Sequence, residues 1–558
     1  MLALLTFVLQ FLFRTLDDNR LTSWEYAFIG IDASILLLIL AAGMISILFF
    51  VRISIPERFY PPALFLAAFC VTAIFWRAPE VNVDASRYFT QAKHLELYGI
   101  SYFIREWGRE INAWTDMPLI PFLYGIMFRV FGESRIFIQI LATTLFSSSV
   151  VLTYKLGESL WSRETGLIAG AFLLGMPYLL TQAPLMLVDV PAMFFLILAV
   201  VTFKTAIEKG SARNIFFAAT AATLAFYAKY STWLMFSVLA IIFFAVIVTA
   251  ANEGRKPESR AGIFRIFFVR LVFIAGVAGL LIGIIFIYKF DVFSSQMKLL
   301  IDYQKPGLGR WQESFLSTFF FQIHPFVTLA AISSIYLAIK KRDIRYAVVS
   351  WLVILIFALQ IKRIRYIIMV FPMIALMAAY AAAEIRSIAV KRFFVYSVLI
   401  SSLSVAVFGY LPFLQRISTV NLKDSGRFSD SLKEPEIEVF TLVPRDPVLN
   451  PAVSVPILDL FTRKKIIYDY KRESFAQPKE KVEKSPLRFT WEYENPAYYG
   501  EPLSGSIDPV VLVISERTDD PLPDELTTRL AQYSIIGSFG TSEEVFRYQT
   551  SVRIYQKN

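Results

Sequence analysis

Apolar runs long enough to cross a lipid bilayer recur along this chain from its start to about residue 414. A bilayer core about 30 Å thick needs about 20 apolar residues per helix. The chain has 558 residues, of which 56% are hydrophobic, whereas a soluble globular domain has roughly 45–50% apolar residues. A water-soluble fold could not bury this much apolar surface. The sequence therefore predicts an α-helical polytopic membrane protein with about 12–13 transmembrane helices.

The candidate spans follow one another closely. They are residues 27–51, 61–76, 135–157, 164–182, 190–207, 212–228, 231–250, 264–288, 315–338, 344–360, 364–383 and 392–414. Residues 1–13 are a candidate for one more span, and no small-residue cleavage site follows them, so we expect this stretch to be retained. Segment 117–131 is also apolar, but it is only about 15 residues long and contains Pro118 and Pro121.

The distribution of Lys and Arg decides whether segment 117–131 crosses the membrane. If it does not cross, the basic loop residues collect on one side, which is the cytoplasm by the positive-inside rule. These residues are Arg52, Arg58, Arg163, Lys204, Lys209, Arg213, Arg255, Lys256, Arg260, Arg265, Lys340, Lys341, Arg342, Arg345, Arg386, Lys391 and Arg392. If it crossed, most of them would move outside. We therefore predict an interfacial or re-entrant segment on the outer face, within a long outer loop over residues 77–134.

Net charge and the numbers of cysteines and histidines bear on nucleic-acid binding, disulfide formation and zinc binding. A net charge of +10 would suggest nucleic-acid binding in a soluble protein. Here the basic residues lie in short loops between apolar runs, so we expect contact with membrane lipid and no nucleic-acid partner. The single cysteine, Cys70, cannot form an internal disulfide. With His94 and His324 as the two histidines, a zinc site of ordinary ligand spacing is not expected.

Three aspartates are predicted on the outer face. Asp84 follows the span that ends near residue 76, and Asp189 lies between two apolar runs. A carboxylate there can act as a general base toward an acceptor hydroxyl or amine, or help to hold a divalent cation. The alternative for each is a helix N-cap, with Pro191 just inside the helix that follows Asp189. Asp116 adds a third carboxylate to a candidate acidic pocket.

Cations are predicted on the same face, against the positive-inside trend. Lys229 lies at one outer turn, and Lys362, Arg363 and Arg365 lie at another, with Tyr366 next in sequence. Lys and Arg at this position suit a phosphate or pyrophosphate group, which Arg can bind with two parallel hydrogen bonds. The alternative is snorkelling to lipid head groups. Acidic groups beside cations, next to the acyl region, favour a lipid-phosphate-linked substrate whose head group reacts at the interface.

Short motifs in a fixed order resemble the GT-C superfamily of glycosyltransferases, close to the protein O-mannosyltransferases and aminoarabinose transferases that use polyprenyl-phosphate sugars. The resemblance covers about residues 75–385. The motifs are Asp84 to Tyr88, Asp116-Met117-Pro118-Leu119 followed by Phe131-Gly132, Leu187 to Pro191, Ala228 to Ser231, and Arg365-Tyr366 with Pro372. The sequence departs from the family pattern at Ala85, where the family often has an acidic residue, and at Met117, where it has a first proline.

The resemblance implies roles for these residues. Asp84 corresponds to the catalytic base or metal-associated carboxylate, and Asp189 to the second catalytic aspartate. Both are therefore candidates to hold a divalent cation, which Ala85 disfavours at Asp84. Lys229 and Arg365 correspond to phosphate-binding residues, and Tyr88, Asp116 and Tyr366 are further candidates for substrate contacts. The reaction implied is inverting transfer from a polyprenyl (dolichyl or undecaprenyl) phosphate sugar to a protein, lipid or glycan acceptor. The family also places the proline-containing segment in juxtamembrane helices outside the bilayer.

The composition after Leu414 becomes charged and proline-rich. Strand-like runs occur at residues 438–443, 510–515, 534–539 and 552–555. The sequence therefore predicts two parts: a GT-C-like transmembrane domain over residues 1–414, and an outer soluble domain over 415–558 of α/β or β-rich type. Residues 416–435 and 470–486 are predicted to be linkers or mobile loops.

Two other functions fit a chain of this kind. A secondary transporter also has about a dozen helices and intramembrane charges, but transporters commonly show internal repeats and a binding site near the midplane. This chain shows no convincing repeat, and its unusual charges lie at one face. An oligosaccharide transferase of the same architecture with a pyrophosphate donor remains the other alternative. The predicted location is the prokaryotic plasma membrane, with the active site and the C-terminal domain outside the cytoplasm.

Overall fold

The computed structural model describes residues 8, 12–19, 22–53, 55–252, 258–305, 313–443, 449–469, 482, 485, 487–500, 509–541 and 549–558. In this part of the chain, eight helical segments are long and apolar enough to cross a membrane. They are α2 (Ala33–Phe50), Glu57–Arg77, α7 (Arg135–Leu160), α10 (Asp189–Lys209), Ser231–Ala251, Phe264–Tyr288, Ile364–Ala383 and Ile388–Leu414. Each lies at a predicted span, so the prediction of a multi-pass α-helical membrane protein is confirmed.

The spans given above without a label consist of the following α-helices, in some cases two to a span. They are α3 (Tyr60–Ala73), α12 (Ser231–Met235), α13 (Ser237–Asn252), α14 (Glu258–Tyr288), α19 (Ile364–Ile367), α20 (Phe371–Ala383), α21 (Ile388–Ser404) and α22 (Leu411–Leu414). The other four predicted spans coincide with shorter helices: α8 (Arg163–Leu174) with α9 (Pro177–Gln182), α11 (Ala212–Ala228), α17 (Pro325–Lys341) and α18 (Tyr346–Ala358). The candidate span 1–13 lies largely outside the described residues.

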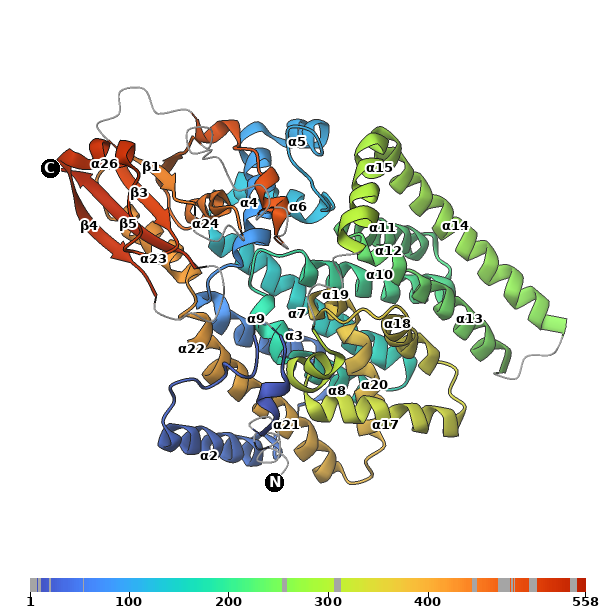
Figure 1. Ribbon diagram of the computed structural model, residues 1–558. Helices are drawn as coiled ribbons and strands as arrows, with labels where there is room; N and C mark the ends of the chain where they lie inside the picture. The colour runs from blue at the N-terminus through green and yellow to red at the C-terminus, as the bar shows by residue number, and fades with distance from the viewer. Residues whose placement is uncertain are drawn as a thin grey trace.

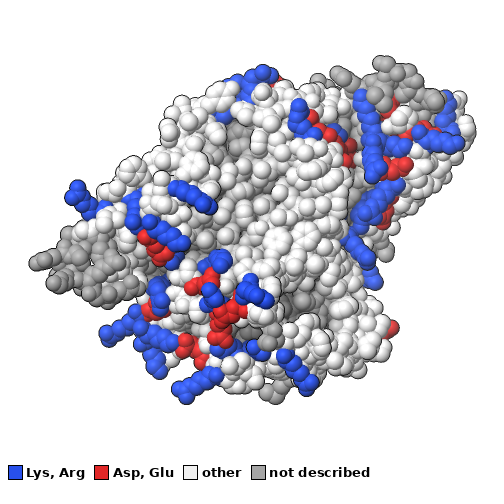
Figure 2. Space-filling view, turned by 180° about the vertical axis from the view of Figure 1, so that it is seen from behind, with Lys and Arg blue, Asp and Glu red and all other residues white. Residues whose placement is uncertain are grey.

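The loops that were predicted to share one side of the membrane contact one another. Arg163 pairs with Glu57 at 2.8 Å, and Lys391 pairs with Glu164 at 2.9 Å. We call this part of the molecule the far end. Figure 2 shows Lys and Arg gathered toward two ends of the molecule, with a broad, largely uncharged band between them, as expected of a protein whose middle faces lipid.

The opposite end, which we call the site end, carries three short helices and the C-terminal sheet (Figure 1). The short helices are α4 (Asn82–Tyr98), α5 (Ile100–Glu106) and α6 (Leu119–Phe131). Helix α6 has 13 residues and is therefore about 20 Å long, less than the thickness of a bilayer core. It packs closely on α4, because a Cβ at Gly125 would lie 2.9 Å from the Ala92 carbonyl oxygen.

The C-terminal region forms a mixed five-stranded sheet with the order β2-β1-β3-β5-β4. The strands are β1 (Glu436–Thr441), β2 (Lys465–Ile467), β3 (Val510–Ser515), β4 (Tyr533–Phe539) and β5 (Ser551–Lys557). β1 is parallel to β2 and β3, with Ile437 opposite Val510, and β5 is antiparallel to β3 and β4. The short helices α24 (Ser454–Leu460) and α26 (Asp524–Arg529) belong to this region. Four strands lie where the sequence predicted them, and β2 was not predicted.

The predicted linker over residues 416–435 is wrong. Residues Thr419–Asp430 form helix α23, which packs against the sheet. Its buried residues are Asn421, Leu422, Lys423, Ser425, Gly426 and Ser429. They include one strongly apolar residue, so the helical periodicity is hidden by polar composition. Most of the other predicted loop, 470–486, lies outside the described residues.

Helix α24 docks the sheet region onto α4. The amide nitrogen of Asn82 donates to the Ser454 hydroxyl at 3.1 Å. About three turns further along α4, the Lys93 ammonium lies 2.6 Å from the Asp459 carboxylate, which also accepts from the Tyr499 hydroxyl at 2.8 Å. Because these contacts flank the first turns of α4, the C-terminal region fixes the position of that helix.

Candidate active site

The first turn of α4 is held by a buried carboxylate in the loop before it. Glu80 accepts a hydrogen bond from Arg135 of α7 at 2.7 Å and another from the Met186 backbone N–H at 2.9 Å. The same Arg135 donates to the Ala78 carbonyl at 2.7 Å. The loop that precedes Asp84 is thereby tied to α7 and to the segment before α10.

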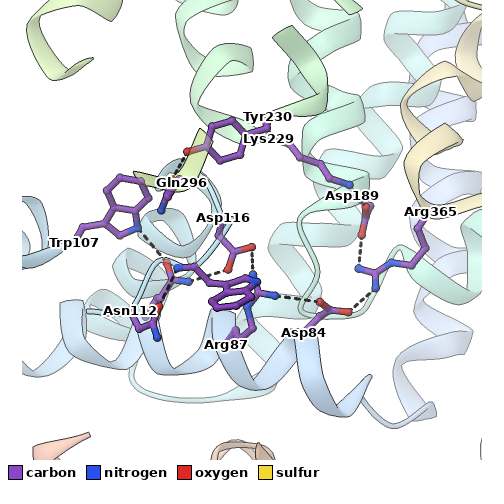
Figure 3. A network of polar contacts seen from close by, with 12 residues as sticks. Asp84, Arg87, Trp107, Asn112, Asp116, Asp189, Lys229, Tyr230, Gln296 and Arg365 are labelled. Atoms are coloured by element: carbon purple, nitrogen blue, oxygen red, sulfur yellow. Dashed lines mark hydrogen bonds and ion pairs between the residues drawn. The ribbon is translucent and has the colours of Figure 1, made fainter. Parts of the chain in front are cut away.

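Four of the predicted site residues form one continuous chain of ion pairs (Figure 3). Arg365 donates from Nη1 to Asp84 at 2.5 Å and from Nη2 to Asp189 at 2.8 Å. Lys229 pairs with the other oxygen of Asp189. The residues come from α4, α10, α19 and the turn after α11, so segments far apart in the sequence meet at one point. Opposite charges alternate along the chain.

A second branch leaves Asp84 toward Asp116. Arg87, one turn further along α4, pairs with Asp116 and lies 3.8 Å from Asp84. Gln91, a further turn along, donates to Asp116 at 3.1 Å and accepts from the Trp107 indole at 3.2 Å. Asp116 is therefore part of the same network as Asp84 but is connected to it through Arg87.

The network becomes more exposed from Asp189 toward Asp84. The exposed fraction of the side chain is 1% for Asp189, 11% for Arg365 and 22% for Asp84. Asp84 is therefore the most accessible of these three side chains. Burial raises the pKa of Asp84, but the charges of Arg365 and Arg87 more than offset it, and the pKa lies below its ordinary value. Asp84 is accordingly ionised at neutral pH.

The pKa of Asp116 is displaced in the opposite direction to that of Asp84. Burial raises the pKa of its carboxyl group, and the pairing with Arg87 offsets this only in part. Two carboxylates of one network therefore have pKa values displaced in opposite directions, an arrangement typical of sites that separate acid and base roles.

The two predicted tyrosines lie beside the network and contact its cations. The Lys229 ammonium lies 5.3 Å from the centre of the Tyr366 ring, within cation–π range. The Arg87 guanidinium lies 5.9 Å from the centre of the Tyr88 ring, and Tyr88 is buried. Tyr366 thus packs against Lys229, and the buried Tyr88 packs against Arg87.

The helix-cap interpretation of the two aspartates is wrong. Asp84 lies inside α4, whose N-cap is Val81, and Asp189 is the first residue of α10, whose N-cap is Val188. Both side chains instead pair with Arg365.

Three further residues of the network were not predicted. Arg87 and Gln91 lie on the Asp84 face of α4, and their spacing of three and four residues was the signal available in the sequence. Glu313 accepts from the backbone N–H of Ile364 at 2.9 Å, directly before Arg365. No local pattern marks Glu313, because its partner is a backbone group about 50 residues away.

An aromatic pair stands next to this network. The rings of Trp114 and Phe489 stack with centroids 5.3 Å apart, and the Arg87 guanidinium lies 5.8 Å from the Phe489 centroid. Phe489 belongs to the C-terminal region, so that region reaches the site itself.

A divalent cation shared by Asp84 and Asp189 does not fit this arrangement. The guanidinium of Arg365 lies between the two carboxylates and hydrogen-bonds both. Among the residues that the structure describes, no three His, Cys, Asp or Glu side chains cluster in a way suited to a metal ion. The network is built for charge pairing with Arg and Lys.

Comparison with known proteins gives a sequence match and a fold match. Residues 115–278 match the sequence profile of the family described as dolichyl-phosphate-mannose-protein mannosyltransferase. Comparison with curated protein sequences gives no significant match. Among solved structures, ArnT from Cupriavidus metallidurans bound to undecaprenyl phosphate superposes with a TM-score of 0.52 and 11% identity, covering 88% of this chain and 97% of that one.

Two more structures are similar. Apo ArnT from the same organism gives a TM-score of 0.50 at 11% identity, with 88% of this chain and 97% of that chain covered. The archaeal oligosaccharyltransferase AglB from Archaeoglobus fulgidus, in complex with an inhibitory peptide and a dolichol-phosphate, gives 0.47 at 11% identity, with 82% and 70% covered. At this identity the likeness to ArnT is one of fold. Together, the matched segment and the shared fold confirm the resemblance to the GT-C glycosyltransferases that the sequence motifs indicate.

Proposed function

We propose that this protein transfers a sugar from a polyprenyl-phosphate carrier to an acceptor hydroxyl or amine at the outer face of the membrane. The observation that carries the proposal is the alternating chain of Asp84, Arg365, Asp189 and Lys229. The last three residues lie at the ends of predicted spans, and Asp84 lies on α4 beside them. Arg and Lys at the bilayer surface are suited to a lipid phosphate, and a partly exposed carboxylate beside them is suited to a proton from the acceptor. The family profile matched by residues 115–278 supports the same class of donor.

The proposed step begins at Asp84. Its carboxylate takes the proton of the acceptor O–H or N–H while the acceptor atom forms a bond to C1 of the sugar. The C1–O bond to the phosphate breaks, and its electron pair remains on the phosphate oxygen. The products are the glycosylated acceptor, inverted at C1, and the free polyprenyl phosphate, with the proton left on Asp84. Arg365 and Lys229 stabilise the negative charge that grows on the phosphate.

Donor binding would also activate the base. In the structure both nitrogens of the Arg365 fork are used by carboxylates. A phosphate that takes over part of this guanidinium weakens its hold on Asp84. The pKa of Asp84, which is now held below its ordinary value, then rises toward the range in which a carboxylate accepts protons better. The base is thus weak without donor and stronger with it, which limits proton uptake to the loaded enzyme.

The positive-inside pattern supports an orientation in which the site end faces away from the cytoplasm. A prokaryotic plasma membrane is the location we propose, with the C-terminal sheet on the outer side. The acceptor is a protein, lipid or glycan, and the experiment below offers all three classes.

The test is a donor screen with purified full-length protein in nanodiscs. Radiolabelled polyprenyl-monophosphate sugars, pyrophosphate-linked sugars and free sugars are offered with mixed peptide, lipid and glycan acceptors. We expect transfer from a monophosphate donor with release of polyprenyl phosphate. Transfer only from a pyrophosphate-linked donor would show that the proposed monophosphate donor is wrong. Uptake of a free solute into proteoliposomes, without transfer from any donor, would instead establish a transporter.

A further inference from the structure

A cavity of about 460 Å³ lies at the far end of the helices. This volume is within the range of roughly 300–1,000 Å³ that is common for small-molecule sites. Its walls come from the ends of α7, α10, α13, α14 and α18. Among the residues that the structure describes, three cationic side chains, Lys204, Arg270 and Arg345, line it together with one carboxylate, Glu208. None of these residues belongs to the candidate active site.

Helix α10 separates this cavity from the active site. Asp189 is its first residue, and Lys204 and Glu208 lie near its last turn. Fifteen residues of helix from Asp189 to Lys204 correspond to about 22 Å. The cavity therefore lies near the other surface of the bilayer, on the side where the positive-inside rule places the cytoplasm.

The described side chains that line the cavity leave an excess positive charge. Lys204 pairs with Glu208 at 2.6 Å, and Arg345 is held by Asp343 at 2.8 Å, so these pairs are neutral. Arg270 is held differently, because its Nη1 donates to two backbone carbonyls, those of Ile207 at 2.5 Å and Glu208 at 2.8 Å. These carbonyls orient the guanidinium without neutralising it.

Arg270 is fitted to its position at the end of α10. Its guanidinium lies against Gly210, where a Cβ would meet Nε at 2.1 Å. Gly210 also has a φ of +68°, which favours glycine. Glycine at this position therefore leaves room for the Arg270 guanidinium beside the C-terminus of α10, where Arg270 lines the cavity.

The cavity continues into an apolar surface that can face lipid. Ile266, which lines the cavity, is 53% exposed. On the same two helices, the exposed side chains include Phe244 and Val248 of α13 and Val269 and Phe273 of α14. An amphiphile with its charged group beside Arg270 can therefore lay its chains along α13 and α14.

We propose that this cavity binds the phosphate of an anionic phospholipid head group from the cytoplasmic leaflet. A net cationic pocket between membrane helices, open toward an apolar surface, matches a molecule with one negative head group and acyl chains. Arg270 donates to the phosphate, and Lys204 shares its ammonium between the phosphate and Glu208. Inorganic phosphate has the same charged group but no chains, so the experiment must separate the two ligands.

The test uses the full-length protein, delipidated in detergent, with bound lipid measured by native mass spectrometry. Phosphatidylglycerol, phosphatidylcholine with the same chains, and inorganic phosphate are titrated separately. We expect phosphatidylglycerol to bind about tenfold more tightly than phosphatidylcholine, and Arg270→Gln to remove most of that preference. Arg270→Lys keeps the charge and should retain part of it. Arg213→Gln, an exposed cation at the far end outside the cavity, is the matched control and should change nothing.

Three results overturn the proposal. The first is equal binding of the two lipids by the wild type. The second is a preference for phosphatidylglycerol that survives both Arg270→Gln and Lys204→Gln. The third is Arg270-dependent binding of inorganic phosphate without any lipid preference, which would make the ligand a soluble anion. Thermal unfolding of each variant in the same detergent verifies that the compared proteins are folded. Because the readout is lipid binding, the result does not depend on the proposed transfer reaction.

Discussion

Arg365 joins Asp84 to Asp189 by placing one nitrogen of its guanidinium 2.5 Å from the first carboxylate and the other 2.8 Å from the second. The planar fork of Arg can bind two groups at once in fixed directions. A base at the mouth of the site and a buried carboxylate at the end of a membrane helix are therefore held at a fixed separation by one side chain. The same side chain is the one proposed to bind the leaving phosphate.

Replacing Asp189 should destabilise the fold. In Asp189→Asn, Lys229 and Arg365 lose their shared counter-charge in a place where Asp189 is only 1% exposed. Removing one partner of a buried ion pair costs about 3–5 kcal/mol, so we expect a clear fall in Tm in a fixed detergent. Glu384→Gln breaks the exposed pair with Lys341 and should cost less than about 1 kcal/mol. Equal effects of the two variants would contradict the described burial.

Arg365→Lys should show whether activity requires only a positive charge at residue 365 or also the planar guanidinium. A lysine keeps one positive charge, but its single ammonium cannot hold both carboxylates and a phosphate in the planar arrangement of the fork. We expect kcat/KM for the donor to fall roughly 10- to 1,000-fold, with a smaller change in Tm than Asp189→Asn gives. Unchanged kcat/KM in folded Arg365→Lys would show that only the charge is required.

Substitutions on the two sides of the contact between α4 and the C-terminal region should have non-additive effects on stability. Lys93 lies 2.6 Å from Asp459 and 3.1 Å from Glu133, and it is largely buried. In a double-mutant cycle of Lys93→Met and Asp459→Asn, we expect a coupling free energy of about 0.5–3 kcal/mol. Because α4 carries Asp84, kcat should fall in the single variants as well.

A control cycle at Arg109 and Asp291, an exposed pair 3.5 Å apart, should give coupling of about 0–1 kcal/mol. Additive effects at Lys93 and Asp459 would mean that the sheet region does not stabilise α4 through this contact.

Lys423 should make stability rise with pH on the alkaline side. Burial, with help from Arg427 and Arg135, lowers the pKa of Lys423 to about 8 from an ordinary value of 10.5. Between these two pH values the unfolded chain holds a proton that the native protein has lost, so raising the pH favours the native state. The Tm of the wild type relative to Lys423→Met should therefore increase from pH 8 to pH 10. Lys433→Met, at an exposed lysine of the same region, controls for the loss of one charge. A difference in Tm that stays flat or falls would contradict this prediction.

The membrane helices could be predicted because each span is a continuous apolar run that can be read directly from the sequence. The positions of the basic residues in the loops then indicate which runs cross the membrane. The same reasoning kept segment 117–131 out of the spans, and α6 has 13 residues there. Helix α23 could not be predicted in this way, because its buried side contains Asn421 and Ser425, whose environment depends on the sheet it packs against.

The site could be predicted in part for the same reason. Charge placement put Asp84, Asp189, Lys229 and Arg365 on one face, and the structure brings them into one network. The pairing order was not predictable, since it depends on how α4, α10 and α19 pack. The contact of Lys93 with Asp459 joins residues 366 positions apart, and no local pattern in the sequence marks such a pair.

The most direct test of the account compares wild type with Asp84→Asn in the donor and acceptor pair that the screen identifies. Loss of the general base should lower kcat about 100- to 10,000-fold in a protein that still folds. Donor should bind at least as tightly as to the wild type, because Arg365 is no longer shared with a charged Asp84. Glu110→Gln, an exposed carboxylate in the same outer loop, should leave transfer unchanged. Transfer by folded Asp84→Asn at the wild-type rate would contradict the assignment of Asp84 as the base.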